Sequence, residues 1–576
     1  MDIYKLPPSP PNLDTVGTFY IAFCVAWTTL VFGGMIFLIV NRKHPILKIR
    51  GLPLTLAAIT FLHAYWILAQ LVYPVGMAMP VLLAYDVQYF FMGLWFPLGV
   101  ALFHASNSRF LHVAARQKKY TEPPLRKRSC CNGGDTSWLC RFRNWGYSKR
   151  ILVYIGLGMI LQVLLTVGMW IACRKYHPTF GILGTELTPG LSISQQLLEL
   201  SRGWEWWPSA LWQVIWTWII APILLYRAWG IRDTLGWRLQ TVGCCISNLH
   251  ATPMWLISTY VPAFAPINMY FAPSEWIHLS VMMFEVFAVF VPCWQLLKHH
   301  RLRKQAIASN TKWETESQAT TARGSVIVPF GLLALAEKGY ATGIVSDDDM
   351  KDHLLTMSAL DHTLQENPTP LQEFSALRDF SGENIAFLTR TASWKSSWPA
   401  SPDGDQTRDL FTRALVIYTD FISPRDAEFP LNLSSQDLKR LESVFEKPAR
   451  ILYGEPTGNP ATPFEDDWSP RSRGSNSEAS SSCKDGMETG RDALADDVAN
   501  KVQYTGDISE SFDLSIFDSA EAHIKYLVLT NTWPKFVQEL RRQSSESESE
   551  SERSDNTEAS QTTIVSRVSD LIRSFL

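Results

Sequence analysis

The sequence lacks the residue patterns that build disulfide-rich, metal-binding or nucleic-acid-binding proteins. Its nine cysteines include no Cys-x-x-Cys pair, and no histidine stands at ligand spacing beside Cys130, Cys131 and Cys140. We therefore expect no disulfide framework, no metal site and no cofactor. Neither half of the chain is basic enough to favour nucleic acid as a partner. Residues 1–16 contain four prolines and one basic residue, which is not the pattern of a cleavable signal peptide.

Charged residues are scarce over residues 1–300, where long apolar runs dominate instead. A helix needs about 20 apolar residues to cross the hydrocarbon core of a bilayer, because its backbone polar groups must be satisfied internally. Seven runs meet that length: 17–40, 51–75, 81–105, 151–173, 207–230, 239–263 and 273–297. The sequence therefore predicts an all-α, multi-pass membrane protein whose first half is a seven-helix transmembrane bundle.

Basic residues between these runs predict the orientation of the chain. The segments 41–50, 106–150 and 227–238 and the residues that follow the last run together contain 22 Lys and Arg residues. The segments on the opposite side contain four. Cytoplasmic loops of membrane proteins carry the excess of Lys and Arg. We therefore expect the N-terminus outside and the C-terminus in the cytoplasm, with the plasma membrane as the expected location.

Seven spans in this orientation resemble a G-protein-coupled receptor in outline only. The third run is followed by Ser106-Asn107-Ser108-Arg109-Phe110, without the acidic-Arg-aromatic triplet of the largest receptor family. The seventh run reads Val291-Pro292-Cys293-Trp294 and lacks Asn-Pro-x-x-Tyr. Topology alone is a weak guide to function.

Ionisable residues within the runs are candidates for an intramembrane polar site, because each is costly to insert into lipid. These candidates are His63, Asp86, His250, His278 and Glu285. Pro253, which follows His250, predicts a kink in the sixth run. The five residues could line a ligand pocket or could simply hold the helices together. The sequence does not identify a ligand.

The second half of the chain is polar and predicts a separate cytoplasmic domain. Apolar residues from Leu360 to Leu377 recur at spacings of three, four and seven, which is typical of an amphipathic helix. Similar patterns predict helices at 408–422 and 434–446 and another that opens at Phe517. The predicted divisions are an outer tail at 1–16, the membrane region at 17–298, a linker at 299–355, a helical domain at 356–541 with a disordered insertion at about 447–511, and an acidic Ser-rich tail with a short amphipathic helix at 542–576.

Four short signatures occur in order within 356–541. They are Glu383-Asn384 after an acidic-aromatic entry, Ile417-Tyr418 with Phe421-Ile422, Asn432-Leu433, and Phe517-Asp518-x-Ala520. On these residues the domain resembles the regulator of G-protein signalling (RGS) family, an all-α bundle. The resemblance covers about 356–446 and 512–541 and departs from the family at the long, Pro- and Ser-rich insertion.

The resemblance implies a GTPase activator without an active site of its own. RGS domains bind the switch regions of a GTP-loaded Gα subunit and accelerate its hydrolysis of GTP. The implied Gα-binding residues are Glu383, Asn384, Asn432, Asn531, Thr532 and Lys535. Asn432 stands at the position whose amide helps to orient the Gα glutamine that positions the attacking water. Asn531 and Lys535 depart from the more usual Asp and Arg, which leaves the choice of Gα open.

Simpler roles remain open for these residues. Asn432 could cap its helix, although Ser434 and Ser435 are better placed to do so. Glu383 and Asn384 could be ordinary helix-start residues.

The whole chain resembles the receptor–regulator fusions of plants and fungi. The expected partners are a GTP-bound Gα, membrane lipids and an unidentified extracellular or membrane ligand. A transporter or channel with a regulatory tail, and a membrane half that serves only as an anchor, are the alternatives.

Overall fold

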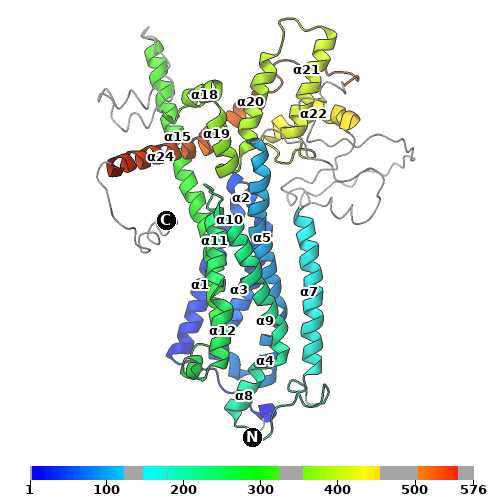
Figure 1. Cartoon of the computed structure of the whole chain (residues 1–576), viewed down its shortest axis with the longest axis vertical. Helices are drawn as coiled ribbons and strands as arrows, with labels where there is room; N and C mark the ends of the chain where they lie inside the picture. The colour runs from blue at the N-terminus through cyan, green and yellow to red at the C-terminus, as the bar shows by residue number, and fades with distance from the viewer. Residues whose placement is uncertain (1–2, 122–146, 178, 323–353, 454–503, 555–576) are drawn as a thin grey trace, which may run out of the picture. The chain divides into compact units, whose positions relative to one another are not determined.

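The computed structural model describes residues 3–121, 147–177, 179–322, 354–453 and 504–554, and these are helical apart from turns, loops and one isolated bridge between Cys173 and Ile182 (Figure 1). The predicted all-α class is therefore confirmed. The chain divides into two compact units. Of the described residues, the first unit comprises 3–113, 147–177 and 179–295, and the second comprises 114–121, 296–322, 354–453 and 504–554.

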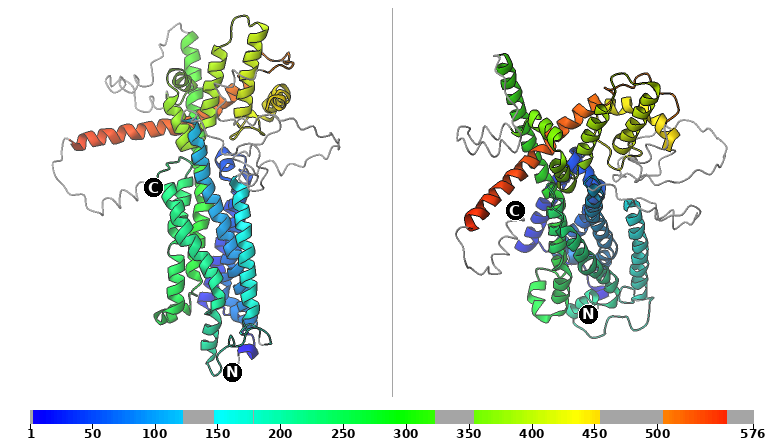
Figure 2. Two further views of the ribbon diagram at one scale, coloured as in Figure 1. Left: turned by 45° about the vertical axis from the view of Figure 1, so that its right-hand side comes forward. Right: turned by 45° about the horizontal axis from the view of Figure 1, so that its top comes forward.

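Long helices lie side by side in the first unit (Figure 2). Its elements are η1 (Ile3–Lys5), α1 (Thr15–Val40), α2 (Pro45–Arg50), α3 (Leu52–Val75), η2 (Gly76–Ala78), α4 (Val81–Phe90), η3 (Phe91–Trp95), α5 (Phe96–Gln117), α7 (Tyr147–Ala172), α8 (Ile193–Ser201), η5 (Trp204–Trp206), α9 (Trp207–Val214), η6 (Ile215–Ile220), α10 (Ala221–Trp229), α11 (Trp237–Asn248), α12 (Ala251–Tyr260), η7 (Pro262–Phe264), α13 (Ala265–Asn268), α14 (Glu275–Glu285), η8 (Val286–Phe290) and α15 (Val291–Ala322). The last residues of α5 and of α15 belong to the second unit.

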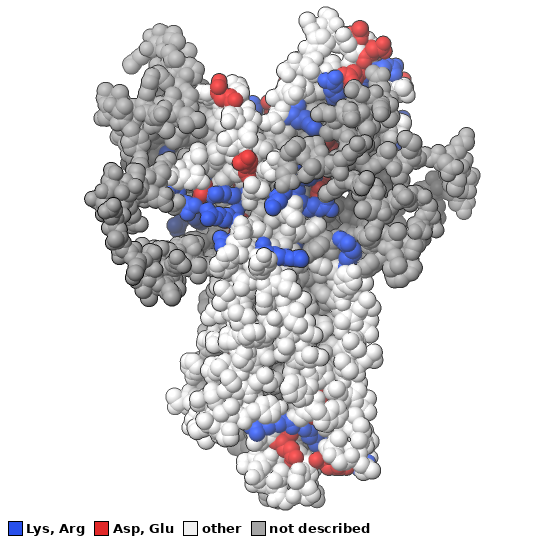
Figure 3. All heavy atoms as spheres, viewed as in Figure 1, with Lys and Arg blue, Asp and Glu red and all other residues white. Residues whose placement is uncertain are grey.

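Six helical segments in the described residues are long and apolar enough to cross a membrane. They are Thr15–Val40, Leu52–Ala78, Val81–Tyr120, Arg150–Ala172, Ile193–Trp229 and Glu275–Thr315. Only 22% of the most apolar stretch of α1 and 17% of that of the α7 segment is buried, so much of their apolar surface has no protein cover. The face of the first unit in Figure 3 carries almost no charged side chains along the length of these helices. A multi-pass membrane protein accounts for both observations, because lipid shields such surfaces.

The predicted sixth span, 239–263, differs from the other six. It consists of two shorter helices, α11 and α12, that are separated at Leu249 and His250. Pro253 explains the break, because proline has no N–H to donate and its ring clashes with the carbonyl of the residue four positions earlier, here Leu249. The predicted kink is thus an interruption, and neither half is long enough to span a bilayer by itself.

Helices also make up the second unit, around one aromatic core. Its elements are the ends of α5 and α15, η4 (Lys118–Tyr120), α18 (Met357–Glu366), α19 (Thr369–Phe374), η9 (Ser375–Asp379), α20 (Gly382–Ser396), α21 (Gly404–Ile417), η10 (Tyr418–Ile422), α22 (Ser435–Tyr453), α23 (Asp518–Asn531) and α24 (Trp533–Ser554). Phe517 is completely buried, stacks on Phe445 at 5.7 Å and meets Trp394 at 5.4 Å. This contact joins α20, α22 and the start of α23, so the segments on both sides of the predicted insertion share one core.

The edges of the predicted insertion and linker differ from the sequence-based boundaries. Helix α22 continues through Pro448 to Tyr453, and Tyr504 and Phe512 pack on Phe411. Tyr504 lies within the predicted insertion, and its side chain supplies apolar surface that the average composition of 447–511 conceals. Helix α15 continues to Ala322, so the beginning of the 299–355 linker is helical. The remainder of the insertion (454–503), of the linker (323–353) and of the tail (555–576) lies outside the described residues.

Candidate functional site

A tight turn before α20 positions the Glu383-Asn384 pair. Phe380 adopts a left-handed backbone conformation with φ of 50° and is buried, a conformation that is uncommon for a bulky residue and often marks a functional turn. The N–H of Ser381 donates to the carbonyl of Ser375 at 2.9 Å and closes the turn. A Cβ at Gly382 would meet the Cβ of Ala376 at 2.8 Å, so this approach requires glycine. Helix α20 begins here, and Glu383 and Asn384 occupy its first turn.

Asp379 joins this turn to the residues between α23 and α24. One carboxylate oxygen of Asp379 accepts from Lys535 Nζ at 2.6 Å, and the other accepts from the Thr532 hydroxyl at 2.8 Å. Ser381 also donates to Asp379, at 3.1 Å, and lies 3.2 Å from the Thr532 hydroxyl. The side chains of Asp379 and Lys535 are 4% and 10% exposed. The cluster therefore fixes the turn, and two predicted Gα contacts, Thr532 and Lys535, have structural partners inside the bundle.

Glu383 is held by a side chain that is distant in sequence. The Gln117 amide donates to Glu383 Oε2 at 3.0 Å and accepts from the N–H of Gly382 at 3.1 Å. Gln117 is completely buried. Burial raises the pKa of Glu383 to about 7, although the hydrogen bond from Gln117 acts in the opposite direction.

Asn432 lies in the loop before α22 and is exposed. The cap of α22 is supplied by Ser434, whose hydroxyl accepts from the N–H of Asp437 at 3.1 Å. Donation to Asp437 by the Ser434 and Ser519 hydroxyls lowers the pKa of that carboxyl. Ser434, rather than Asn432, therefore stabilises the start of the helix, as its position in the sequence suggested.

The structure brings part of the predicted set together. Asp379 and Ser381 connect the turn before Glu383 to Thr532 and Lys535. Asn384 in α20 and Asn531 at the end of α23 are partly exposed, and Asn432 lies on the separate loop before α22. Asp379 and Phe380 are the acidic-aromatic pair that precedes the first signature. The sequence predicted no separate role for Asp379.

In the first unit, two of the five intramembrane candidates bind each other. His63 Nδ1 lies 2.7 Å from Glu285 Oε1, and its other ring nitrogen lies 3.1 Å from the Thr28 hydroxyl. The indole N–H of Trp27 donates to the second Glu285 oxygen. Both His63 and Glu285 are buried. Because these groups satisfy one another across α1, α3 and α14, the cluster holds the three helices together.

The other three candidates lie apart from that pair. His278 contacts the carbonyl of Ser274 at 2.6 Å and the ring of Tyr65 at 4.3 Å. Asp86 accepts from the Trp170 indole at 2.8 Å, and His250 lies at the break between α11 and α12. The five residues therefore do not form one common site.

Sequence reasoning missed a buried ion pair near the start of α9. Lys175 Nζ lies 2.6 Å from Glu205 Oε1, and the two side chains are 8% and 0% exposed. Lys175 also donates to the carbonyls of Glu199 and Arg202. Lys175 was counted only as a basic loop residue, and no local pattern links it to Glu205.

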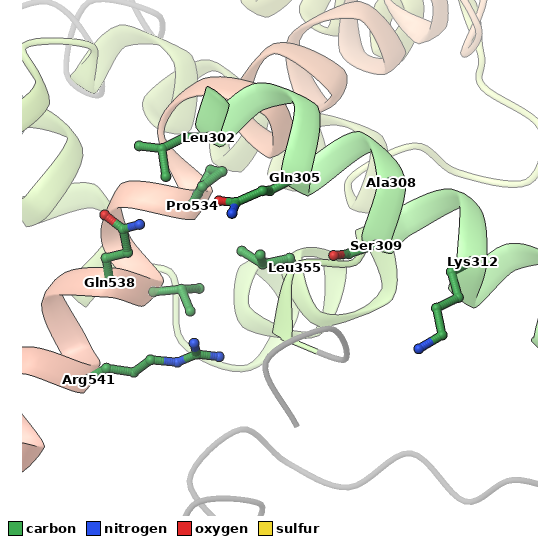
Figure 4. A pocket seen from close by; sticks show the side chains of 10 residues that line it. Leu302, Gln305, Ala308, Ser309, Lys312, Leu355, Pro534, Gln538 and Arg541 are labelled. Carbon is green, nitrogen blue, oxygen red and sulfur yellow. The ribbon is translucent and has the colours of Figure 1, made fainter. Parts of the chain in front are cut away.

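A cavity of about 610 Å³ in the second unit separates the end of α15 from α24 (Figure 4). Leu302, Leu355 and Pro534 contribute apolar surface, and Lys312 and Arg541 contribute charge. None of the six predicted Gα contacts lines it.

Comparison of the chain with family models, with curated proteins and with solved structures finds no match.

Proposed function

We propose that this chain is a membrane-anchored regulator of heterotrimeric G-protein signalling whose second unit binds GTP-loaded Gα and accelerates GTP hydrolysis. The observation that carries the proposal is the placement of Asn432, which is exposed at the loop before α22 while Ser434 caps that helix. The ordered turn that presents Glu383 and Asn384 supports it.

The chemistry of these residues suits a partner that contains its own catalytic groups. An asparagine amide both donates and accepts hydrogen bonds and does not titrate. Phosphoryl transfer depends mainly on positioning and on electrostatic stabilisation of the transferred group. A fixed amide that orients the Gα glutamine would lower the barrier without donating an acid, a base or a nucleophile. The protein is accordingly proposed to have no enzymatic activity of its own.

The test is single-turnover GTP hydrolysis by candidate Gα subunits mixed with the full chain in lipid nanodiscs. The chain should be saturating, so that the measured rate is that of the complex and does not depend on the fraction of Gα that is bound. Acceleration of at least one Gα supports the proposal. If no Gα subunit is accelerated or bound at saturation, the proposal is wrong.

The membrane half is proposed to have seven spans, with α11 and α12 together forming the interrupted sixth. The basic residues of the loops support an outside N-terminus, a cytoplasmic second unit and a plasma-membrane location. The proposal holds both for a membrane half that senses a ligand and for one that only anchors the regulator. In either case, attachment to the membrane raises the effective concentration of the regulator near membrane-bound Gα.

This topology predicts that an epitope tag after Leu576 is protected from external protease in intact cells. A tag before Met1 should be cleaved under the same conditions, and both should be cleaved after permeabilisation. Cleavage of the C-terminal tag in intact cells would contradict the seven-span arrangement.

A further inference from the structure

We propose that the Gα-binding surface is occupied by the chain's own segment Arg116–Tyr120, which must leave before Gα can bind. This inference rests on the proposed function and adds regulation of the same surface. The segment comprises the end of α5 and the turn η4, and all the contacts described below lie within the second unit. We call Arg116–Tyr120 the masking segment.

The first contact covers Glu383 itself. Gln117 bonds both the Glu383 carboxylate and the N–H of Gly382, at 3.0 and 3.1 Å. The side chain of Gln117 is completely buried, so a partner approaching Glu383 from this side must displace it. A Cβ at Gly382 would lie 3.0 Å from Gln117 Oε1, which shows how closely the segment approaches the start of α20.

The second contact is with the loop that leads to Asn432. Lys119 Nζ lies 2.7 Å from one carboxylate oxygen of Glu428, and Arg116 Nε lies 3.1 Å from the other. Tyr120 packs over Phe421 and Phe429 with ring centroids at 6.5 and 6.4 Å. The masking segment therefore bridges the start of α20 and the loop three residues before Asn432.

The masking segment contacts the start of α20 and the loop before α22, and these two elements carry proposed Gα contacts. Glu383 is one of those contacts, and Glu428 and Phe429 belong to the loop that carries Asn432. A Gα switch region that engages both Glu383 and Asn432 would need the space held by Gln117 and Tyr120. Occupation by the masking segment and by Gα is therefore mutually exclusive.

The strength of the contact suits a reversible mask. Arg116 and Lys119 are 46% and 43% exposed, and such ion pairs are individually weak. Each hydrogen bond of the masking segment replaces hydrogen bonds to water, so its net contribution to the free energy of docking is modest. A partner that binds only the unmasked form shifts the population toward that form, at the cost of apparent affinity.

Because Glu383 is buried, docking of the masking segment is expected to depend on pH. Its pKa is raised to about 7, so the masked form binds more protons than a solvent-exposed Glu383 between about pH 4.5 and 7. The contact consequently weakens as the pH rises through that range. The charged or polar groups around Glu383 are Gln117, Lys119 and Asp379; Gln117 and Lys119 favour the ionised form, whereas Asp379 opposes it.

Charge reversal tests the mask in the full chain in nanodiscs. The double variant Arg116→Glu/Lys119→Glu should repel Glu428 and expose the surface. Its Kd for Gα loaded with GDP and aluminium fluoride should fall about tenfold relative to the unmodified chain. Adding Glu428→Lys restores opposite charges and should return the Kd to within about twofold of the original value. Lys118→Glu makes the same kind of charge change at a neighbouring exposed residue and should leave the Kd unchanged.

A second measurement follows the docked segment without Gα. The N–H of Gly382 is at the start of a helix, where no intrahelical acceptor exists, so its protection comes from Gln117. Hydrogen exchange at Gly382 should accelerate at least about tenfold in Gln117→Ala, because the amide loses its acceptor.

The outcomes separate this inference from the proposed function. An unchanged or higher Kd in the charge-reversed double variant, or no recovery on adding Glu428→Lys, would overturn the mask. Unchanged exchange at Gly382 in Gln117→Ala would show that the segment is not docked there. If no form of the chain binds Gα, the proposed function fails and the mask fails with it, while the exchange measurement still decides whether the segment is docked.

Discussion

Asn432→Ala is expected to lower the maximal rate of GTP hydrolysis in the chain–Gα complex by about a hundredfold or more, toward the rate of Gα alone. Removal of one donor from an acyl-transfer oxyanion hole costs about 3–4 kcal/mol of transition-state stabilisation, and we expect a similar loss for a positioned amide in this complex. The Asn432 side chain is exposed in a loop fixed by the bond from the N–H of Leu431 to the Phe421 carbonyl at 2.8 Å. A truncation at the exposed position should therefore leave the bundle intact.

The matched control is Ser434→Ala. Ser434 caps α22 and donates to Asp437 at 2.6 Å, so its loss should cost about 1 kcal/mol of unfolding free energy. Maximal acceleration should remain near that of the unmodified chain. The pair of variants thus separates a positioning role from a capping role. An Asn432→Ala chain that keeps full acceleration, or that loses it only in proportion to unfolding, would contradict the assignment.

Residual binding provides a further readout. If Asn432 acts on the transition state, Asn432→Ala should still bind Gα loaded with GDP and aluminium fluoride through Glu383 and Asn384, though more weakly. The comparison requires a Gα subunit that the unmodified chain demonstrably accelerates, because Asn531 and Lys535 differ from the Asp and Arg that are more usual in RGS domains.

Apolar run length predicted the long membrane helices well. The run 51–75 became α3 at Leu52–Val75, because hydropathy directly measures the length that a bilayer demands. Hydropathy placed the end of the third run at residue 105, whereas α5 continues to Gln117. The extension is amphipathic and buries Phe110, Val113 and Gln117. A measure of average hydropathy does not detect such a helix, because its polar face cancels its apolar face.

The candidate surface was predictable only where its residues are neighbours in sequence. Glu383 and Asn384 are adjacent, and their signature marked the position at which α20 begins. The side chains that contact this turn come from far along the chain: Gln117 is 266 residues from Glu383, and Lys535 is 156 residues from Asp379. No spacing rule in a single sequence connects such pairs, because only tertiary packing brings them together. The split of the sixth span was partly predictable, since Pro253 marks the place but not the extent of the break.

Asp379→Ala is expected to destabilise the second unit by about 3–5 kcal/mol, the usual cost of removing one partner from a buried ion pair. Lys535 would remain 10% exposed and without the carboxylate that lies 2.6 Å away. Thr532 would also lose an acceptor at 2.8 Å. The measurement is urea unfolding of the second unit in the full chain, followed by hydrogen exchange in α20 and α23.

A double-mutant cycle shows whether the unpaired charge causes the loss. Asp379→Ala/Lys535→Met removes both charges, and replacement of a buried pair by apolar side chains is often close to neutral. The double variant should therefore be more stable than Asp379→Ala alone, with a coupling energy of about 1–3 kcal/mol. Asp420→Ala is the control. Asp420 pairs with Arg390, and the two side chains are 48% and 36% exposed, respectively, so this ion pair should contribute less than about 1 kcal/mol.

The cycle also decides the role of Lys535 toward Gα. If Lys535 mainly holds the turn before Glu383, the double variant should recover Gα affinity together with stability, since the turn can re-form around an apolar pair. If Lys535 binds Gα directly, stability should recover while affinity stays low. If Asp379→Ala proves as stable as Asp420→Ala, the ion pair between Asp379 and Lys535 does not support the turn. The account of how Glu383 is positioned would then be wrong.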